Sequence, residues 1–111
     1  MGIDNVKAAI IWRRQLDGRA RVLLQHMAMV SLDHPKQDQA ARRYWEGWPS
    51  MALVLGYDVP PDDATDTASV RARETARIGT RKVVRRLREA GAIKVVRQPA
   101  PHRSTEYELL L

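Results

Sequence analysis

The segment from Thr67 to Ala90 has the strongest helical pattern in the chain. Its apolar or small side chains recur at intervals of three and four residues, at Ala72, Ala76, Thr80, Val83, Leu87 and Ala90. The opposite side carries guanidinium groups at the same spacing, at Arg77, Arg81, Arg85 and Arg88. This pattern predicts a long amphipathic helix that packs through one side and presents a row of positive charges on the other.

The ends of this predicted helix carry recognisable signals. Asp66 or Thr67 can cap its N-terminus, and Gly91 ends it. Gly79 lies inside the segment, where glycine costs about 1 kcal/mol relative to alanine. Because the apolar stripe stays in phase across Gly79, we predict a continuous helix. The alternative is a break at Gly79, with Thr80 capping a new helix.

Positive charge is concentrated around this helix and the segment after it. Residues 71–103 contain eleven basic and two acidic residues, a net charge of +9, whereas the whole chain carries +6. Such a cluster predicts a polyanionic partner, most commonly nucleic acid. The chain has fifteen arginines and four lysines, which suits phosphate binding because guanidinium groups match phosphate oxygens. A GC-rich coding sequence would give the same ratio without explaining the clustering.

The remaining composition indicates one intracellular domain over residues 1–111. A chain of 111 residues with 44% hydrophobic content can bury a modest core. The absence of cysteine excludes disulfides, thiol catalysis and cysteine-based zinc sites. The N-terminus has the wrong charge order for a secretory signal, and no apolar run approaches the roughly 18 residues of a membrane span. We therefore expect a cytoplasmic protein with no membrane contact.

Two helices are predicted in the N-terminal part of the chain. Residues 4–16, within an extension over residues 1–16, repeat apolar side chains at helical spacing, although a strand through residues 8–12 is the competing assignment. This first helix could cap its own core or form a homodimer. A second helix is predicted from about Arg19 to Leu32. Its expected buried stripe is Val22, Leu23, His26, Met27 and Val30, which makes His26 a core histidine rather than a ligand.

A polar connection over residues 33–47 follows. The aromatic residues that crowd its end are Tyr44, Trp45 and Trp48. They could stack on nucleic-acid bases, but we favour core packing because the chain has no phenylalanine. A short helix is predicted from Pro49 or Ser50 to about Leu55, and Ser50 can cap it. Residues 57–66 form an acidic loop insertion with four aspartates, which we expect to point away from phosphate groups.

The C-terminal residues 92–111 predict a β-hairpin. Two β-rich runs, residues 93–97 and 104–110, flank a loop that contains two prolines. The basic residues near its tip are Lys94, Arg97, His102 and Arg103. The expected fold class is therefore mostly α with a C-terminal β-hairpin, an α+β fold.

The order of these elements resembles the winged helix-turn-helix DNA-binding superfamily. Residues 79–93 (GTRKVVRRLREAGAI) are similar to its recognition helix and the exit from that helix, and residues 48–56 (WPSMALVLG) to its second helix. From Asp17 onward the chain resembles small helix-turn-helix proteins of actinobacterial phages and integrative elements. It departs from the pattern in the acidic insertion, since the turn between these two helices usually has only a few residues.

The resemblance implies binding to double-stranded DNA, with the recognition helix in the major groove and the hairpin, as a wing, on the adjacent backbone or minor groove. A major groove about 12 Å wide admits one helix, and arginines on that helix can reach guanine edges or phosphates. The expected DNA-binding residues are Arg77, Arg81, Lys82, Arg85, Arg88, Lys94, Arg97, His102 and Arg103. The expected role is transcriptional regulation, or an accessory step in replication or excision of a mobile element.

Two other functions fit the same features. An adaptor of this fold could bind an acidic protein surface, and an RNA-binding winged helix would use the same basic residues. Catalysis finds little support, because His26, His34 and His102 lie on different elements without metal-binding spacing, and there is no glycine-rich phosphate loop. We therefore expect no catalytic residues, no metal site and no cofactor.

Overall fold

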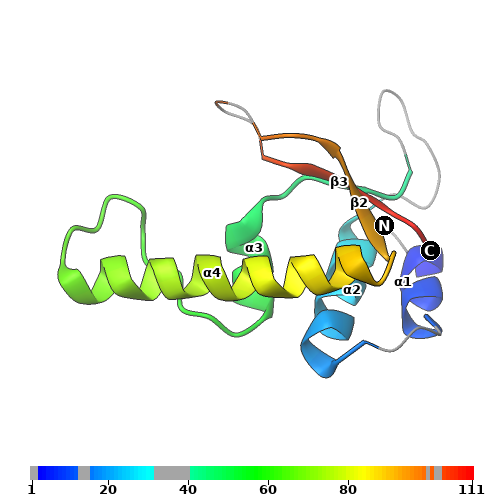
Figure 1. Ribbon diagram of the computed structural model, residues 1–111, viewed down its shortest axis with the longest axis horizontal. Coiled ribbons are helices and arrows are strands. Elements are labelled where there is room, and N and C mark those ends of the chain that lie inside the picture. Colours follow the sequence, from blue (N-terminus) through cyan, green and yellow to red (C-terminus); the bar gives the residue numbers. More distant parts are fainter. Residues whose placement is uncertain (1–2, 13–15, 32–40, 100, 102–103) are drawn as a thin grey trace.

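Within the residues that it describes (3–12, 16–31, 41–99, 101 and 104–111), the computed structural model has four helices and one three-stranded antiparallel sheet (Figure 1). The elements are α1 (Ile3–Ile10), α2 (Gly18–Val30), β1 (Arg43–Tyr44), α3 (Trp48–Val54), α4 (Thr67–Glu89), β2 (Ile93–Arg97) and β3 (Glu106–Leu109). The α+β class is therefore confirmed. None of these helices combines the length and apolar composition that a membrane span requires.

The longest element, α4, follows the predicted helical pattern from end to end. The Asp66 carboxylate accepts the backbone N–H of Ser69 at 2.9 Å and caps the helix, as predicted. Gly91 follows its last turn with a φ of 78°, a conformation that favours glycine. The buried side chains of α4 are Ala76, Thr80, Val83, Val84 and Leu87. The prediction of one continuous helix through Gly79 is confirmed.

A packing contact explains why a glycine stands in the middle of α4. A β-carbon at position 79 would overlap the hydroxyl of Tyr57, which lies against the helix at this point. The Tyr57 ring also contacts the Arg19 guanidinium, whose carbon is 5.0 Å from the ring centre. Gly79 thus allows the segment after α3 to pack closely on α4.

Helix α2 matches the predicted helix apart from its bounds and part of its buried stripe. It begins at Gly18, one residue before the predicted start, because Asp17 caps it by accepting the backbone N–H of Ala20 at 2.9 Å. Val22 and Val30 are exposed, so their assignment to the buried stripe was wrong. The buried residues of α2 are Ala20, Leu23, Leu24, Met27 and Ala28. The reason is that α1, α3, α4 and β1 all pack on α2, so that its buried face is broader than one stripe and turned away from Val22.

The first helix, α1, ends at Ile10 and is shorter than the predicted helix over residues 4–16. The helical assignment is confirmed and the boundary is wrong. After α1 the chain forms a tight turn, in which the Trp12 backbone N–H donates to the carbonyl of Ala9, three residues earlier, at 3.2 Å. On the inner side of α1, the buried Asn5 amide contacts the Ser31 carbonyl and accepts from Arg42. The helix therefore packs through one side, while Ile3 and Ile10 remain exposed.

The sheet contains a strand that the sequence pattern did not predict. β1 lies in the segment assigned to a connection, and it pairs with β3 to give the strand order β1-β3-β2. Tyr44 is opposite Tyr107, which is opposite Val95 on the inner face of the sheet. The predicted hairpin of β2 and β3 is confirmed. A two-residue strand is too short to show alternation, and it forms because β3 offers it a free edge.

Only one of the three clustered aromatic residues is fully buried. Tyr44 is 1% exposed, and its hydroxyl lies 3.2 Å from Nε2 of His26, which confirms His26 as a core histidine. Trp48 is half-buried, whereas Trp45 is exposed, so the core assignment was wrong for Trp45. α3 begins at Trp48 because Gly47 is its N-cap, with a φ of 91°; the predicted cap at Ser50 was therefore wrong.

The contact between Gly79 and Tyr57 predicts a context-dependent substitution. In a Tyr57→Ala background, Gly79→Ala should raise the free energy of unfolding by about 1 kcal/mol through helix propensity. In the wild-type background this gain should vanish or reverse, because the new methyl group displaces the Tyr57 ring. Urea denaturation of the four proteins measures the difference. Gly18→Ala, where an added β-carbon meets open space, is the matched control. Equal effects of Gly79→Ala in both backgrounds would contradict the prediction.

The environment of His26 predicts a loss of stability in mild acid. Burial lowers the pKa of His26, and the Glu46 carboxylate, 3.6 Å away, opposes this only in part. The unfolded chain therefore takes up the proton first, and the folded state loses stability as the pH falls below about 6.5. Urea denaturation at about pH 7.5 and pH 5.5 should show a larger loss for wild type than for His26→Gln, which keeps a hydrogen-bonding group beside Tyr44. Identical losses in both proteins would rule out His26 as the source.

Candidate nucleic-acid interface

The structure separates the basic cluster into paired and unpaired residues. The basic residues of α4 that form no ion pair with a carboxylate of the described residues are Arg71, Arg73, Arg81, Lys82, Arg85 and Arg88. Four of these six lie between residues 81 and 88. Positive charge that no nearby carboxylate balances is therefore greatest along the second half of α4.

A groove runs between α4, the start of α3 and the hairpin of β2 and β3, with a volume of about 640 Å³. The four arginines of the predicted row line this groove: Arg77, Arg81, Arg85 and Arg88. The row predicted from helical spacing therefore lies along one side of α4. That side faces the hairpin across the groove, rather than lying directly opposite the core as the sequence suggested.

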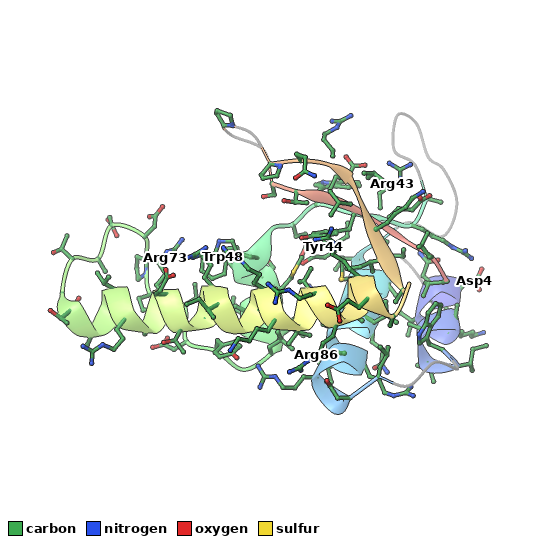
Figure 2. The ribbon with its side chains drawn as sticks, in the orientation of Figure 1. Asp4, Arg43, Tyr44, Trp48, Arg73 and Arg86 are labelled. Carbon is green, nitrogen blue, oxygen red and sulfur yellow. The ribbon has the colours of Figure 1, made fainter. Side chains whose placement is uncertain are left out.

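The floor of the groove combines apolar, aromatic and hydroxyl groups. Its side chains come from α3, α4 and the hairpin: Trp48, Met51, Thr80, Val84, Val95 and Tyr107. Figure 2 shows Trp48 close to Arg73, whose guanidinium carbon is 5.0 Å from the Trp48 ring centre. Burial raises the pKa of Tyr107, and the positive charge of Arg88 partly opposes this. The groove thus has a basic rim around a largely uncharged floor.

Arg77 differs from the other arginines of the row because it is paired on its own helix. Its Nε donates to the Glu74 carboxylate at 3.1 Å, and a second nitrogen contacts the other carboxylate oxygen. These hydrogen bonds lower the pKa of Glu74 and raise that of Arg77. The charge of Arg77 is therefore partly balanced, and Arg81, Arg85 and Arg88 carry most of the net positive charge of the groove.

Lys82 lies away from the groove, on the other flank of α4. It lines a smaller concavity together with Arg19, Tyr57 and Arg86. Figure 2 shows Arg86 on the side of α4 away from Trp48, and Arg86 Nη1 lies 3.0 Å from the Asp17 carboxylate at the start of α2. The structure therefore does not bring Lys82 together with the groove arginines, and the charge of its neighbour Arg86 is balanced.

The predicted basic residues of the hairpin face carboxylates on the outer side of the sheet. Lys94 Nζ lies 3.2 Å from Glu108, and Arg97 Nε lies 3.9 Å from Glu106. Arg43 of β1 joins both carboxylates and stands on the outer side of the sheet in Figure 2. Sequence reasoning missed this balance, although the alternation of residues 105–109 already places both glutamates on one face. His102 and Arg103 lie outside the described residues.

The acidic insertion lies beside the N-terminal end of α4, at the far end of that helix from the hairpin's attachment (Figure 1). Arg73 Nη1 donates to the Pro60 carbonyl at 2.9 Å, which fastens the loop to the helix. Asp58, Asp62 and Asp63 of this loop are exposed. The expectation that the loop avoids phosphate stays a prediction.

The described residues give less support to a metal site or a histidine-based site than to a basic interface. Among the described residues, no three side chains of histidine, aspartate or glutamate lie together as a metal site would need. The histidine of the core, His26, is used in the contacts with Tyr44 and Glu46. Comparison of the chain with known proteins finds no matching family model, no matching curated protein and no matching solved structure.

Proposed function

We propose that the protein binds double-stranded DNA as a winged helix-turn-helix domain. The observation that carries this proposal is the row of guanidiniums of Arg81, Arg85 and Arg88, which no carboxylate of the described residues pairs, on a helix that borders a hairpin. The order of α2, the short helix α3, the basic helix α4 and the hairpin supports it, since this order resembles that of a winged helix. In this proposal α4 is the recognition helix, the hairpin is the wing and α1 is an extension.

The dimensions of α4 suit this role. Its 23 residues span about 34 Å, and a helix of this width enters the major groove of B-DNA. Arg81 and Arg85 are exposed and can reach base edges or phosphates from the helix. A DNA strand whose phosphate backbone runs between α4 and the hairpin would contact Arg88. Lys94 and Arg97 contribute less in this proposal, because Glu106 and Glu108 balance them.

The biological role that fits such a domain is transcriptional regulation, or an accessory step in replication or excision of a mobile element. An acidic protein surface and a structured RNA are alternative partners for the same guanidiniums. An acidic protein surface and a structured RNA share the negative charge of duplex DNA but not its dimensions. Competition experiments between these partners therefore distinguish the three possibilities.

The test is a fluorescence anisotropy titration of a labelled random duplex at several salt concentrations. Arg81→Gln and Arg85→Gln should each weaken binding, on the order of tenfold at about 0.1 M salt if one phosphate contact is lost. Each should also reduce the slope of log K against log salt by about 0.9. The matched control is Arg86→Gln, on the same helix, where Asp17 already balances the charge.

Binding that is equally weak in all four proteins, wild type included, would contradict DNA binding and favour an acidic protein partner. If a structured RNA displaces the duplex at a much lower concentration than unlabelled duplex does, RNA is the preferred partner. If Arg86→Gln weakens binding as much as Arg85→Gln, the interface extends to the other flank of α4, and the groove is not its centre.

A further inference from the structure

The floor of the groove holds a buried polar group without a partner. Thr80 is 1% exposed, and its hydroxyl has no hydrogen-bond partner among the described residues. Buried hydroxyls are almost always hydrogen-bonded, so an unpaired one at the floor of a groove calls for an explanation. A duplex lying across the rim would contact the arginines, and it would leave this floor unused.

The walls around Thr80 provide a surface for a flat apolar group. α3 supplies Trp48 and Met51, and the hairpin supplies Tyr107 and Val95 from the other side. Trp48 and Tyr107 are half-buried, so that part of each ring is accessible. Polar side chains of the hairpin, Gln98, Ser104 and Thr105, also line the groove. Sites for small aromatic molecules combine apolar and aromatic walls with polar groups that fix the orientation. The groove volume of about 640 Å³ is also within the usual range for such ligands.

The charge of the groove selects an anion. Arg81, Arg85 and Arg88 are unpaired, and no carboxylate of the described residues lines the groove. Arg88 acts electrostatically on Tyr107, which indicates that a guanidinium lies near the aromatic part of the floor. A ligand with a ring and a carboxylate or phosphate would satisfy both the floor and the rim.

We infer that the groove between α4, α3 and the hairpin is a binding site for a small aromatic anion. Its ring lies between Trp48 and Tyr107, and its anionic group binds the rim arginines. The Thr80 hydroxyl donates a hydrogen bond to the same ligand. This inference goes beyond the proposed DNA binding, since it concerns a different ligand. Because both ligands use the rim arginines, the small anion competes with DNA and provides a means of releasing it.

The first experiment uses the full chain and 2-naphthoate, an aromatic ring with one carboxylate. Titration followed by ¹H–¹⁵N NMR should give saturable shifts of the Thr80, Val84 and Tyr107 amides, with a dissociation constant below about 1 mM. Naphthalene-2-methanol, which keeps the ring without the charge, and acetate, which keeps the charge without the ring, should each bind at least about tenfold more weakly. No saturable shift, or equal affinity for the neutral alcohol, overturns the inference.

Variants assign the binding to these residues. Thr80→Val replaces the hydroxyl with a methyl group of similar size, so the fold should persist, and thermal unfolding checks this. It should weaken 2-naphthoate several-fold, and Arg88→Gln about tenfold. Arg86→Gln, on the other flank of α4, should leave the affinity unchanged. If Thr80→Val and Arg88→Gln both bind as tightly as wild type, the ligand lies elsewhere and the site is disproved.

A competition experiment separates this inference from the proposed function. At 2-naphthoate concentrations about ten times its dissociation constant, simple competition lowers the apparent affinity for duplex about elevenfold. If 2-naphthoate binds but the duplex affinity does not change, the competition is wrong. A chain that binds 2-naphthoate but no duplex refutes DNA binding and leaves the ligand site intact. A chain that binds duplex but not 2-naphthoate supports DNA binding and refutes the ligand site.

Discussion

The burial of one side of α4 against α2, α3 and β2 is the interaction on which the rest of the structure depends. Val83 and Leu87 place apolar surface in the core, where each fully buried large apolar side chain contributes about 1.5–3 kcal/mol. The end of the same helix positions the sheet, because the Ala92 backbone N–H donates to the Leu87 carbonyl and the Ala92 carbonyl accepts from Leu110. These hydrogen bonds join the end of the helix to the base of the hairpin, and so set the position of the groove between them.

The first half of α4 is held in a different way. It extends away from the other helices and the sheet, as Figure 1 shows, and it buries little apolar surface. Three local contacts attach the connecting segment to it: the Asp66 cap, the hydrogen bond from Arg73 to the Pro60 carbonyl, and the packing of Tyr57 on Gly79. The insertion between α3 and α4 is thus fastened along the helix, which explains how a long connection is compatible with a defined helix pair.

Charge along the chain and charge in the folded protein differ because of pairing across the sheet and between helices. Residues 71–103 hold eleven basic and only two acidic residues, but Glu108, Glu106 and Asp17 lie outside this segment and come next to Lys94, Arg97 and Arg86, respectively, on folding. Exposed ion pairs contribute little stability, about 0–1 kcal/mol each. Within the described part of this cluster, the residues that these pairs leave without a carboxylate partner all lie on α4, where a groove and an aromatic floor accompany several of them.

Local sequence patterns predicted α4, the hairpin and the arginine row on one side of the helix, favoured continuity through Gly79 over a break, and gave Asp66 as one of two candidate caps. Helical spacing and β alternation are local properties, so the residues carry them without any partner. Features that depend on neighbouring elements became evident only in the folded chain. β1 exists because β3 has a free edge, and Val22 is exposed because α2 is covered from several other sides. The arginine row borders a groove and Lys82 does not, because α3 and the hairpin pack on one side of α4 only. Such contacts join residues far apart in the chain, and no local pattern records them.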